Sequence, residues 1–214
     1  MDLLNCLAGP LKAARRRKSL LLFFAATHIV FLVFGQWMVA QEVPAVVFMR
    51  AEQLKAIQTL PYLQPLTGLL AGGLPLKILY TFFFNLVFGA FLSTTIMGFI
   101  FFVPYMIAVW RGFIIGVLVY GIDATPSMIA VFYGTFILEF GAYSISSAIG
   151  TDAGLSLLFP WRKGTESRWE ALKMAMREGR ELYLLVVILL FAGAIWEMTW
   201  LEYMGPLIKL GGIE

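Results

Sequence analysis

Long apolar runs alternate with short polar or charged segments along the chain, and their lengths predict its helices. Four runs, at residues 19–40, 78–110, 127–150 and 182–201, reach the roughly 20 apolar residues that a helix needs to cross a bilayer. A fifth run, at residues 112–121, would form a helix only about 15 Å long. The pattern predicts an all-α, polytopic membrane protein with about five spans, one of them short or re-entrant.

The second run is too long for a single straight span. As one helix, residues 78–110 would reach almost 50 Å, against a hydrocarbon thickness of about 30 Å. The run is therefore expected to tilt, bend or break, and Pro104 supplies a cause, because proline removes one backbone donor and crowds the preceding turn. Arg111 then marks a polar boundary on the cytoplasmic side. Residues 112–150 form either one short and one full crossing or a re-entrant hairpin.

Two connections between the runs have a distinctive composition. Residues 41–77 contain several prolines and glycines beside a few charges, which predicts an extracytoplasmic or interfacial connection. Before the run at 127–150, either Thr125 or Ser127 can cap the helix.

Residues 161–181 have the pattern of an amphipathic helix. Ser167 and Glu170 have the spacing of a capping box. The apolar side of this helix would carry Trp169, Leu172, Met176 and Gly179. We expect a cytoplasmic helix at the membrane interface that leads directly into the last span, with a solvated linker helix as the alternative.

Charge sets the orientation. The chain is 60% hydrophobic and 14% charged, with a mean hydropathy of +0.84, which excludes a soluble cytosolic enzyme. Five basic residues precede residue 19, and the positive-inside rule predicts that residues 1–18 are cytoplasmic. Residues 161–181 are also basic, so an even number of crossings precedes them; two or four satisfy this, and four is preferred. Residues 19–214 then form one helical domain in the cell membrane.

The same basic segment is a candidate contact for anionic lipid headgroups, and nothing in the charge pattern points to nucleic acid. The predicted headgroup contacts are Arg162, Lys163, Arg168, Lys173, Arg177 and Arg180.

Glu139 is the main candidate for a functional site, because a carboxylate near the middle of a bilayer is costly unless it is protonated or paired. Two interpretations stay open: a proton, ion or substrate site between helices, or a buried carboxyl that fixes helix packing. The predicted intramembrane polar site also includes Ser146, which shares the helix face of Glu139, and Tyr133. Asn85 completes it, with an amide that either joins two helices or belongs to a binding site. Ala142, Ser146 and Gly150 also repeat every four residues, a spacing of small side chains that allows two helices to approach closely.

No sequence motif indicates a reaction. The chain lacks a P-loop, HExxH, CxxC and GxSxG, and one histidine with one cysteine cannot build a plausible zinc site. We therefore expect no enzymatic activity, no cofactor and no metal.

Two sets of residues form a recognisable pattern. The set in the second half of the chain is Tyr133, Gly134, Glu139, Gly150, Phe159, Pro160, Arg168, Ala171 and residues 192–197. The set in the middle of the chain is Asn85, Gly89, Gly98, Pro104, Arg111, Gly112 and Gly116. Together they resemble the stage II sporulation protein M family of multi-spanning membrane proteins. Tyr133 stands where the family commonly has histidine. A tyrosine hydroxyl does not titrate near neutral pH as an imidazole does, so the resemblance implies a hydrogen-bonding group near Glu139 and not a titrating one.

The resemblance implies a helical membrane scaffold. In spore-forming bacteria the family member acts with peptidoglycan-degrading proteins as their membrane-embedded organiser. For this chain we expect a non-enzymatic scaffold or accessory subunit, whose partners are the lipid bilayer and other membrane proteins or a second copy. The alternative is a transporter or channel component with a carboxylate site at Glu139.

Overall fold

The computed structural model describes residues 3–57, 61, 63–67, 72–122 and 125–204, and within them all regular structure is helical. The helices of the first half are α1 (Leu3–Arg16), α2 (Lys18–Ala40), α3 (Pro44–Ile57), α4 (Gln64–Thr67), α5 (Leu74–Phe84), the π-helix η1 (Asn85–Ile96) and the short 3₁₀-helix η2 (Met97–Phe99). Those of the second half are α6 (Val103–Val119), α7 (Pro126–Leu158), the 3₁₀-helix η3 (Pro160–Lys163) and α8 (Arg168–Met204).

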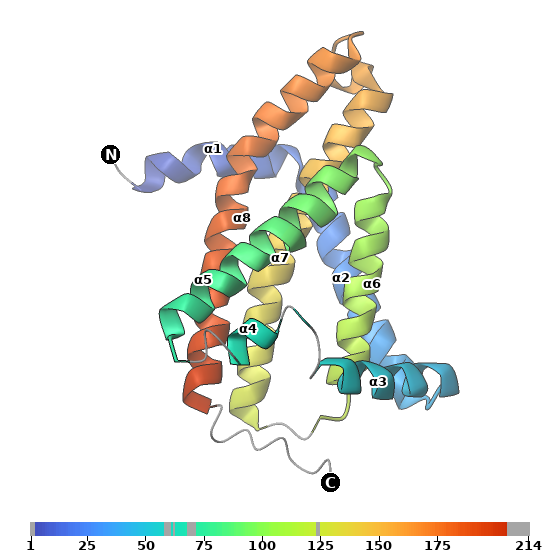
Figure 1. Ribbon diagram of the computed structural model, residues 1–214. Coiled ribbons are helices and arrows are strands. Elements are labelled where there is room, and N and C mark those ends of the chain that lie inside the picture. The colour runs from blue at the N-terminus through green and yellow to red at the C-terminus, as the bar shows by residue number, and fades with distance from the viewer. Residues whose placement is uncertain (1–2, 58–60, 62, 68–71, 123–124, 205–214) are drawn as a thin grey trace.

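Five helical rods build the bundle, and two shorter helices lie across its ends. Figure 1 shows α2, the continuous α5–η1–η2 rod, α6, α7 and α8 running along the bundle, with α1 crossing it near one end and α3 at the other. Four described helices, residues 18–40, 74–99, 126–158 and 168–203, are long and apolar enough to cross a membrane, and α6 is a shorter apolar helix of 17 residues. The all-α prediction is confirmed, and the apolar helices agree with a polytopic membrane protein.

The apolar run at residues 78–110 breaks into two rods, one of the outcomes expected from its length, and the break lies before Pro104. Helix η2 ends at Phe99, the chain turns through residues 100–102, and α6 begins at Val103. Pro104 lies in the first turn of α6, where its missing N–H is not needed. The turn itself is apolar, with 51% of Ile100 and 52% of Phe102 exposed, so hydropathy gives no signal for it.

The earlier break also changes the position of Arg111, which the hydropathy pattern predicts at a polar boundary. Arg111 and Gly112 lie in the middle of α6, and the predicted short span at residues 112–121 is largely the second half of that helix. Helices α6 and α7 are joined at the end of the bundle where α3 lies (Figure 1). Thr125 caps α7 by accepting a hydrogen bond from the Met128 N–H at 3.3 Å, which decides between the two predicted caps.

Glycines allow two pairs of rods to pack backbone against backbone. A Cβ added at Gly116 would overlap the Leu32 carbonyl oxygen of α2. In the other pair, a Cβ at Gly98 would overlap the Gly150 backbone of α7, and one at Gly154 would overlap the Gly98 carbonyl oxygen. Close approach of this kind is how small residues stabilise helix pairs in membranes.

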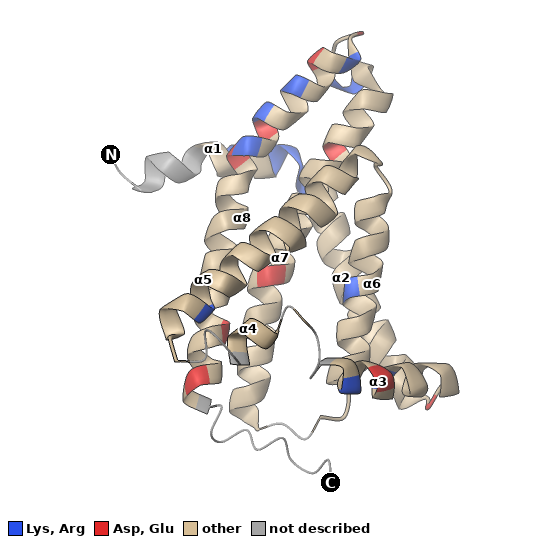
Figure 2. Cartoon of the chain, in the orientation of Figure 1, with Lys and Arg blue, Asp and Glu red and all other residues tan. Residues whose placement is uncertain are grey.

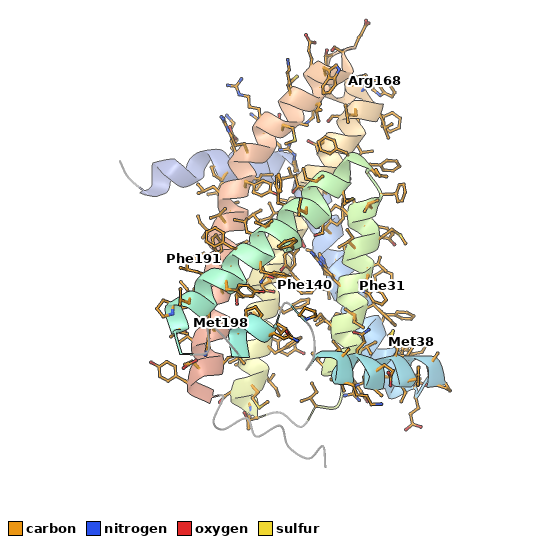
Figure 3. The ribbon with its side chains drawn as sticks, viewed as in Figure 1. Phe31, Met38, Phe140, Arg168, Phe191 and Met198 are labelled. Atoms are coloured by element: carbon orange, nitrogen blue, oxygen red, sulfur yellow. The ribbon has the colours of Figure 1, made fainter. Side chains whose placement is uncertain are left out.

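Helices α7 and α8 form a hairpin that extends past α1 (Figure 1). They contain 33 and 37 residues, which corresponds to about 50 and 55 Å at 1.5 Å per residue. Figure 3 shows Arg168 at the tip of α8, with Phe191 further along the helix and Met198 near its opposite end. In the connection, Gly164 has a φ of 72°, a left-handed conformation that glycine adopts without strain. We call the part of this hairpin from Ala153 to Arg177 the α7–α8 arm.

The predicted amphipathic segment at residues 161–181 contains most of η3 and the beginning of α8, which continues without a break into the last span. Its capping box forms only in part. The Ser167 hydroxyl accepts from the Glu170 N–H at 3.4 Å, whereas the Glu170 carboxylate accepts from the Thr165 hydroxyl at 2.7 Å. On the predicted apolar side, Leu172 is buried in the bundle and Trp169 is 70% exposed, so Trp169 is free to contact a membrane interface.

Candidate functional site

Four charged side chains form a network where α1 meets α2 beside the α7–α8 hairpin. Arg17 donates from Nη2 to Asp152 Oδ2 at 2.7 Å and to Glu178 Oε2 at 2.8 Å. Lys163 Nζ donates to the same two oxygens at 2.9 and 3.0 Å. We call Arg17, Asp152, Lys163 and Glu178 the Arg17 network.

Two members of the Arg17 network are removed from solvent. The side chains of Arg17 and Asp152 are 4% and 8% exposed, and Arg17 also donates to the Ala175 carbonyl oxygen at 3.2 Å. The network brings the N-terminal basic segment to the basic part of α8. Figure 2 shows Lys and Arg gathered at this end, where α1 meets α2 and along the extended part of α8. As the charge pattern predicted, both arginine-rich segments lie at one end of the bundle.

The second candidate site surrounds Glu139, halfway along the membrane-length helix α7. Asn85 donates from Nδ2 to Glu139 Oε1 at 2.6 Å. Asn85 begins the π-helix η1, a wider helical turn that is frequent at functional sites. Both residues line a cavity of about 150 Å³, and Glu197 of α8 lines it as well.

Small residues of α8 make room for this carboxylate. A Cβ added at Gly193 would lie 3.4 Å from Glu139 Cγ. A third polar group at the cavity is Thr81 of α5, which is 8% exposed and whose hydroxyl has no hydrogen-bond partner within the described residues. Two carboxylates, an amide and a hydroxyl, contributed by the α5–η1 rod, α7 and α8, thus share one small cavity.

Arg111 lies deeper in the bundle and does not join either site directly. Its Nη2 donates to the Gly89 carbonyl oxygen at 2.8 Å and to the Ser93 hydroxyl at 2.9 Å. Its guanidinium carbon lies 4.2 Å from the ring centroid of Tyr143, a cation–π distance. Tyr143 is one helical turn beyond Glu139 on α7, so both side chains lie on the face of α7 that packs on η1 and α6.

Hydroxyl groups continue this polar face toward the Arg17 network. Thr94 of η1 donates to the Ser146 hydroxyl at 2.7 Å, and Thr95 is hydrogen-bonded to the Tyr183 hydroxyl. On a neighbouring face, His28 Nδ1 lies 3.1 Å from the Ser144 hydroxyl. These bonds satisfy polar groups between helices without exposing them to lipid.

The structure brings together only some of the residues predicted for the intramembrane site. Asn85 contacts Glu139, whereas Ser146 lies two turns away from Glu139. Tyr133 is 47% exposed and lines a different cavity, formed with Phe132 and residues of α2 and α6. The predicted packing residues Ala142, Ser146 and Gly150 are buried on the side of α7 that faces η1.

The six predicted headgroup residues also divide into two sets. Lys163 is bound to two carboxylates, and Arg162 lies beside it at a cavity of about 480 Å³. The other four, which are exposed along α8, are Arg168, Lys173, Arg177 and Arg180.

Sequence reasoning missed the Arg17 network and the place of Arg111. The residues of the network lie up to 161 positions apart, and Glu178 is one of several acids in a charged helix. A signal was present in Asp152, the single acid between Glu139 and Glu166, which lies among small buried residues. Among the residues that the structure describes, no three His, Cys, Asp or Glu side chains lie close enough together to hold a metal ion.

Comparison with known proteins decides the family. The model of stage II sporulation protein M matches residues 19–200. The chain belongs to the stage II sporulation protein M family. The family match covers α2 to α8 except for the last residues of α8, so Glu139, Arg111 and Asp152 lie inside it and Arg17 lies just before it. No curated protein and no solved structure matches the chain.

Proposed function

We propose that this member of the stage II sporulation protein M family is a non-enzymatic membrane scaffold or accessory subunit. It binds another membrane protein, or a second copy of itself, through the α7–α8 arm. The observation that carries the proposal is the length of this hairpin. Helices of about 50 and 55 Å exceed the roughly 30 Å of bilayer hydrocarbon, and they extend past α1 as one packed unit.

The surface of the arm supports the proposal. Trp161 and Trp169 are 68% and 70% exposed, and the arm also presents arginines and lysines. Tryptophan and arginine are enriched in the residues that contribute most to protein interfaces. By the positive-inside rule this basic end faces the cytoplasm, so the partner site is cytoplasmic in a multi-pass protein of the cell membrane.

Photo-crosslinking in native membranes tests the partner site. A photoreactive residue at position 169 is expected to give adducts of defined higher mass with a protein. The matched control is position 37, near the end of α2 that lies away from the arm, where Trp37 is 53% exposed. A photoreactive residue at this position is expected to give lipid adducts only. If position 169 gives no protein adduct and the protein purified in mild detergent is strictly monomeric, the proposal is wrong.

The cavity at Glu139 favours a second candidate function, a transporter or channel component. Glu139 and Glu197 line one cavity, and within the described residues neither has a Lys or Arg nitrogen within 4.0 Å. Two carboxylates in a low-dielectric setting repel each other unless a proton or a cation neutralises one of them. Such a site is what proton or cation translocation requires.

Flux measurements on reconstituted liposomes test this second function. With a membrane potential imposed, proton or sodium entry is expected to fall at least about tenfold in Glu139→Gln, because the amide cannot release a proton or balance a cation. Glu52→Gln, at an exposed residue of α3, is the control and should keep the wild-type rate. Equal fluxes for wild type and Glu139→Gln would contradict a transport role.

A further inference from the structure

A polar cavity of about 480 Å³ lies beside the Arg17 network, at the end of the bundle where α1 crosses it. Five elements contribute to its lining. The lining residues are Arg16, Arg17, Ser19, Leu20, Asp152, Arg162, Lys163, Met174 and Glu178. A volume of this size is in the usual range of small-molecule sites.

The charges at this cavity do not balance. Arg17 and Lys163 are paired with Asp152 and Glu178, which leaves Arg16 and Arg162 as two additional cations. Arg16 Nη1 forms a long ion pair with Glu178 at 3.8 Å, beyond hydrogen-bond distance, and Arg162 is exposed. Four cations and two carboxylates thus leave the cavity lining with a net charge of two positive units.

A buried guanidinium adds to these charges. Arg17 is 5% exposed, and its Nε and Nη2 donate to the network. Its Nη1 is shielded from the cavity and has no hydrogen-bond partner among the described residues, so Arg17 would act on an anion in the cavity through its charge. The first turn of the 23-residue helix α2 also lines the cavity at Ser19, and no side chain of the described residues caps this helix. The positive end of the helix dipole favours an anion at the same place.

We propose that this cavity binds a phosphate group, supplied either by the headgroup of an anionic phospholipid or by a soluble phosphate compound. Guanidinium groups match the geometry of phosphate oxygens through paired N–H bonds, and here Arg16 and Arg162 line one space beside the buried charge of Arg17. Leu20 and Met174 give the lining an apolar part, suited to the glycerol and first acyl carbons of a lipid. The site is separate from the Glu139 cavity. Three of its lining residues, Arg162, Lys163 and Met174, belong to the α7–α8 arm.

Ligand-dependent thermal stability of the full-length, delipidated protein in detergent tests the site. Dioctanoyl phosphatidylglycerol is expected to raise the unfolding midpoint with saturation, and dioctanoyl phosphatidylcholine is not. Arg162→Gln should raise the half-saturating concentration about fivefold, the effect of one lost cation near an anionic headgroup. Arg168→Gln removes an exposed cation of α8 that does not line the cavity, and it should leave that concentration unchanged.

Inorganic phosphate, titrated in parallel, separates the two sources. Stabilisation by phosphate alone at equal concentration identifies a soluble ligand, and stabilisation by phosphatidylglycerol alone identifies the lipid; either supports the site. The proposal is overturned if the two lipids act equally, if neither anion stabilises the protein, or if Arg162→Gln and Arg168→Gln weaken binding to the same extent. Arg162 is exposed, so its replacement leaves the fold intact and the test stays informative.

Discussion

Gly150→Ala is expected to lower the free energy of unfolding by about 3 kcal/mol, the upper part of the range for overpacking. The new Cβ would overlap the Thr94 carbonyl oxygen and lie 2.9 Å from the Thr95 Cα. Both are backbone atoms of η1, so no change of rotamer relieves the overlap and the helices must separate. Reversible unfolding in mixed micelles, followed by tryptophan fluorescence, measures the change.

Gly141→Ala in the same helix is the matched control for this experiment. Its Cβ would meet only the Leu189 Cδ1, at an ordinary contact distance of 3.7 Å. Because alanine favours helix over glycine by about 1 kcal/mol, we expect stability to stay the same or to rise by up to that amount. Equal losses in the two variants would show that the close crossing of α7 and η1 is not what makes Gly150 necessary.

Asp152→Asn is expected to lower the free energy of unfolding by about 3 to 5 kcal/mol, as when one partner of a buried ion pair is removed. The change leaves Arg17 and Lys163 with one carboxylate between them, and Arg17 is only 4% exposed at its side chain. Chemical unfolding in detergent gives the size of the loss. Protease cleavage near Arg17 should also increase, because the network attaches the connection between α1 and α2 to the α7–α8 hairpin.

An exposed ion pair supplies the control for Asp152. The side chains of Lys55 and Glu52 are 75% and 53% exposed and 3.1 Å apart. Glu52→Gln is therefore expected to cost less than about 0.5 kcal/mol. A comparable loss at Glu52 and Asp152 would mean that burial does not set the strength of the Arg17 network.

Hydropathy predicted most helices well because the backbone of a segment inside a bilayer has no water to which it can hydrogen-bond. Within hydrocarbon every N–H and C=O must be bonded inside its own segment, so a long apolar run has to be a helix. The runs at residues 19–40 and 182–201 accordingly lie within α2 and α8. The run at 127–150 lies within α7, although α7 continues to Leu158 because small and apolar residues follow Gly150.

Hydropathy could not locate the turn between η2 and α6. Residues 100–102 are as apolar as the helices on either side, so the sequence shows one run where the structure has two rods. Arg111 was then assigned to a boundary, because a charge normally marks the end of a span. The structure shows how this charge is accommodated inside the bundle. The Gly89 carbonyl oxygen and the Ser93 hydroxyl accept hydrogen bonds from Arg111, and the Tyr143 ring lies against its guanidinium.

The sequence by itself determined the helical class, the family and the clustering of basic segments at one end, because these follow from local composition and spacing. Tertiary structure alone decided which side chains meet. Asn85 reaches Glu139 across 54 residues, and Arg17 reaches Asp152 across 135. Such pairs depend on how helices cross and on which glycines permit close approach. Local composition and spacing in a single sequence do not indicate which distant positions will meet.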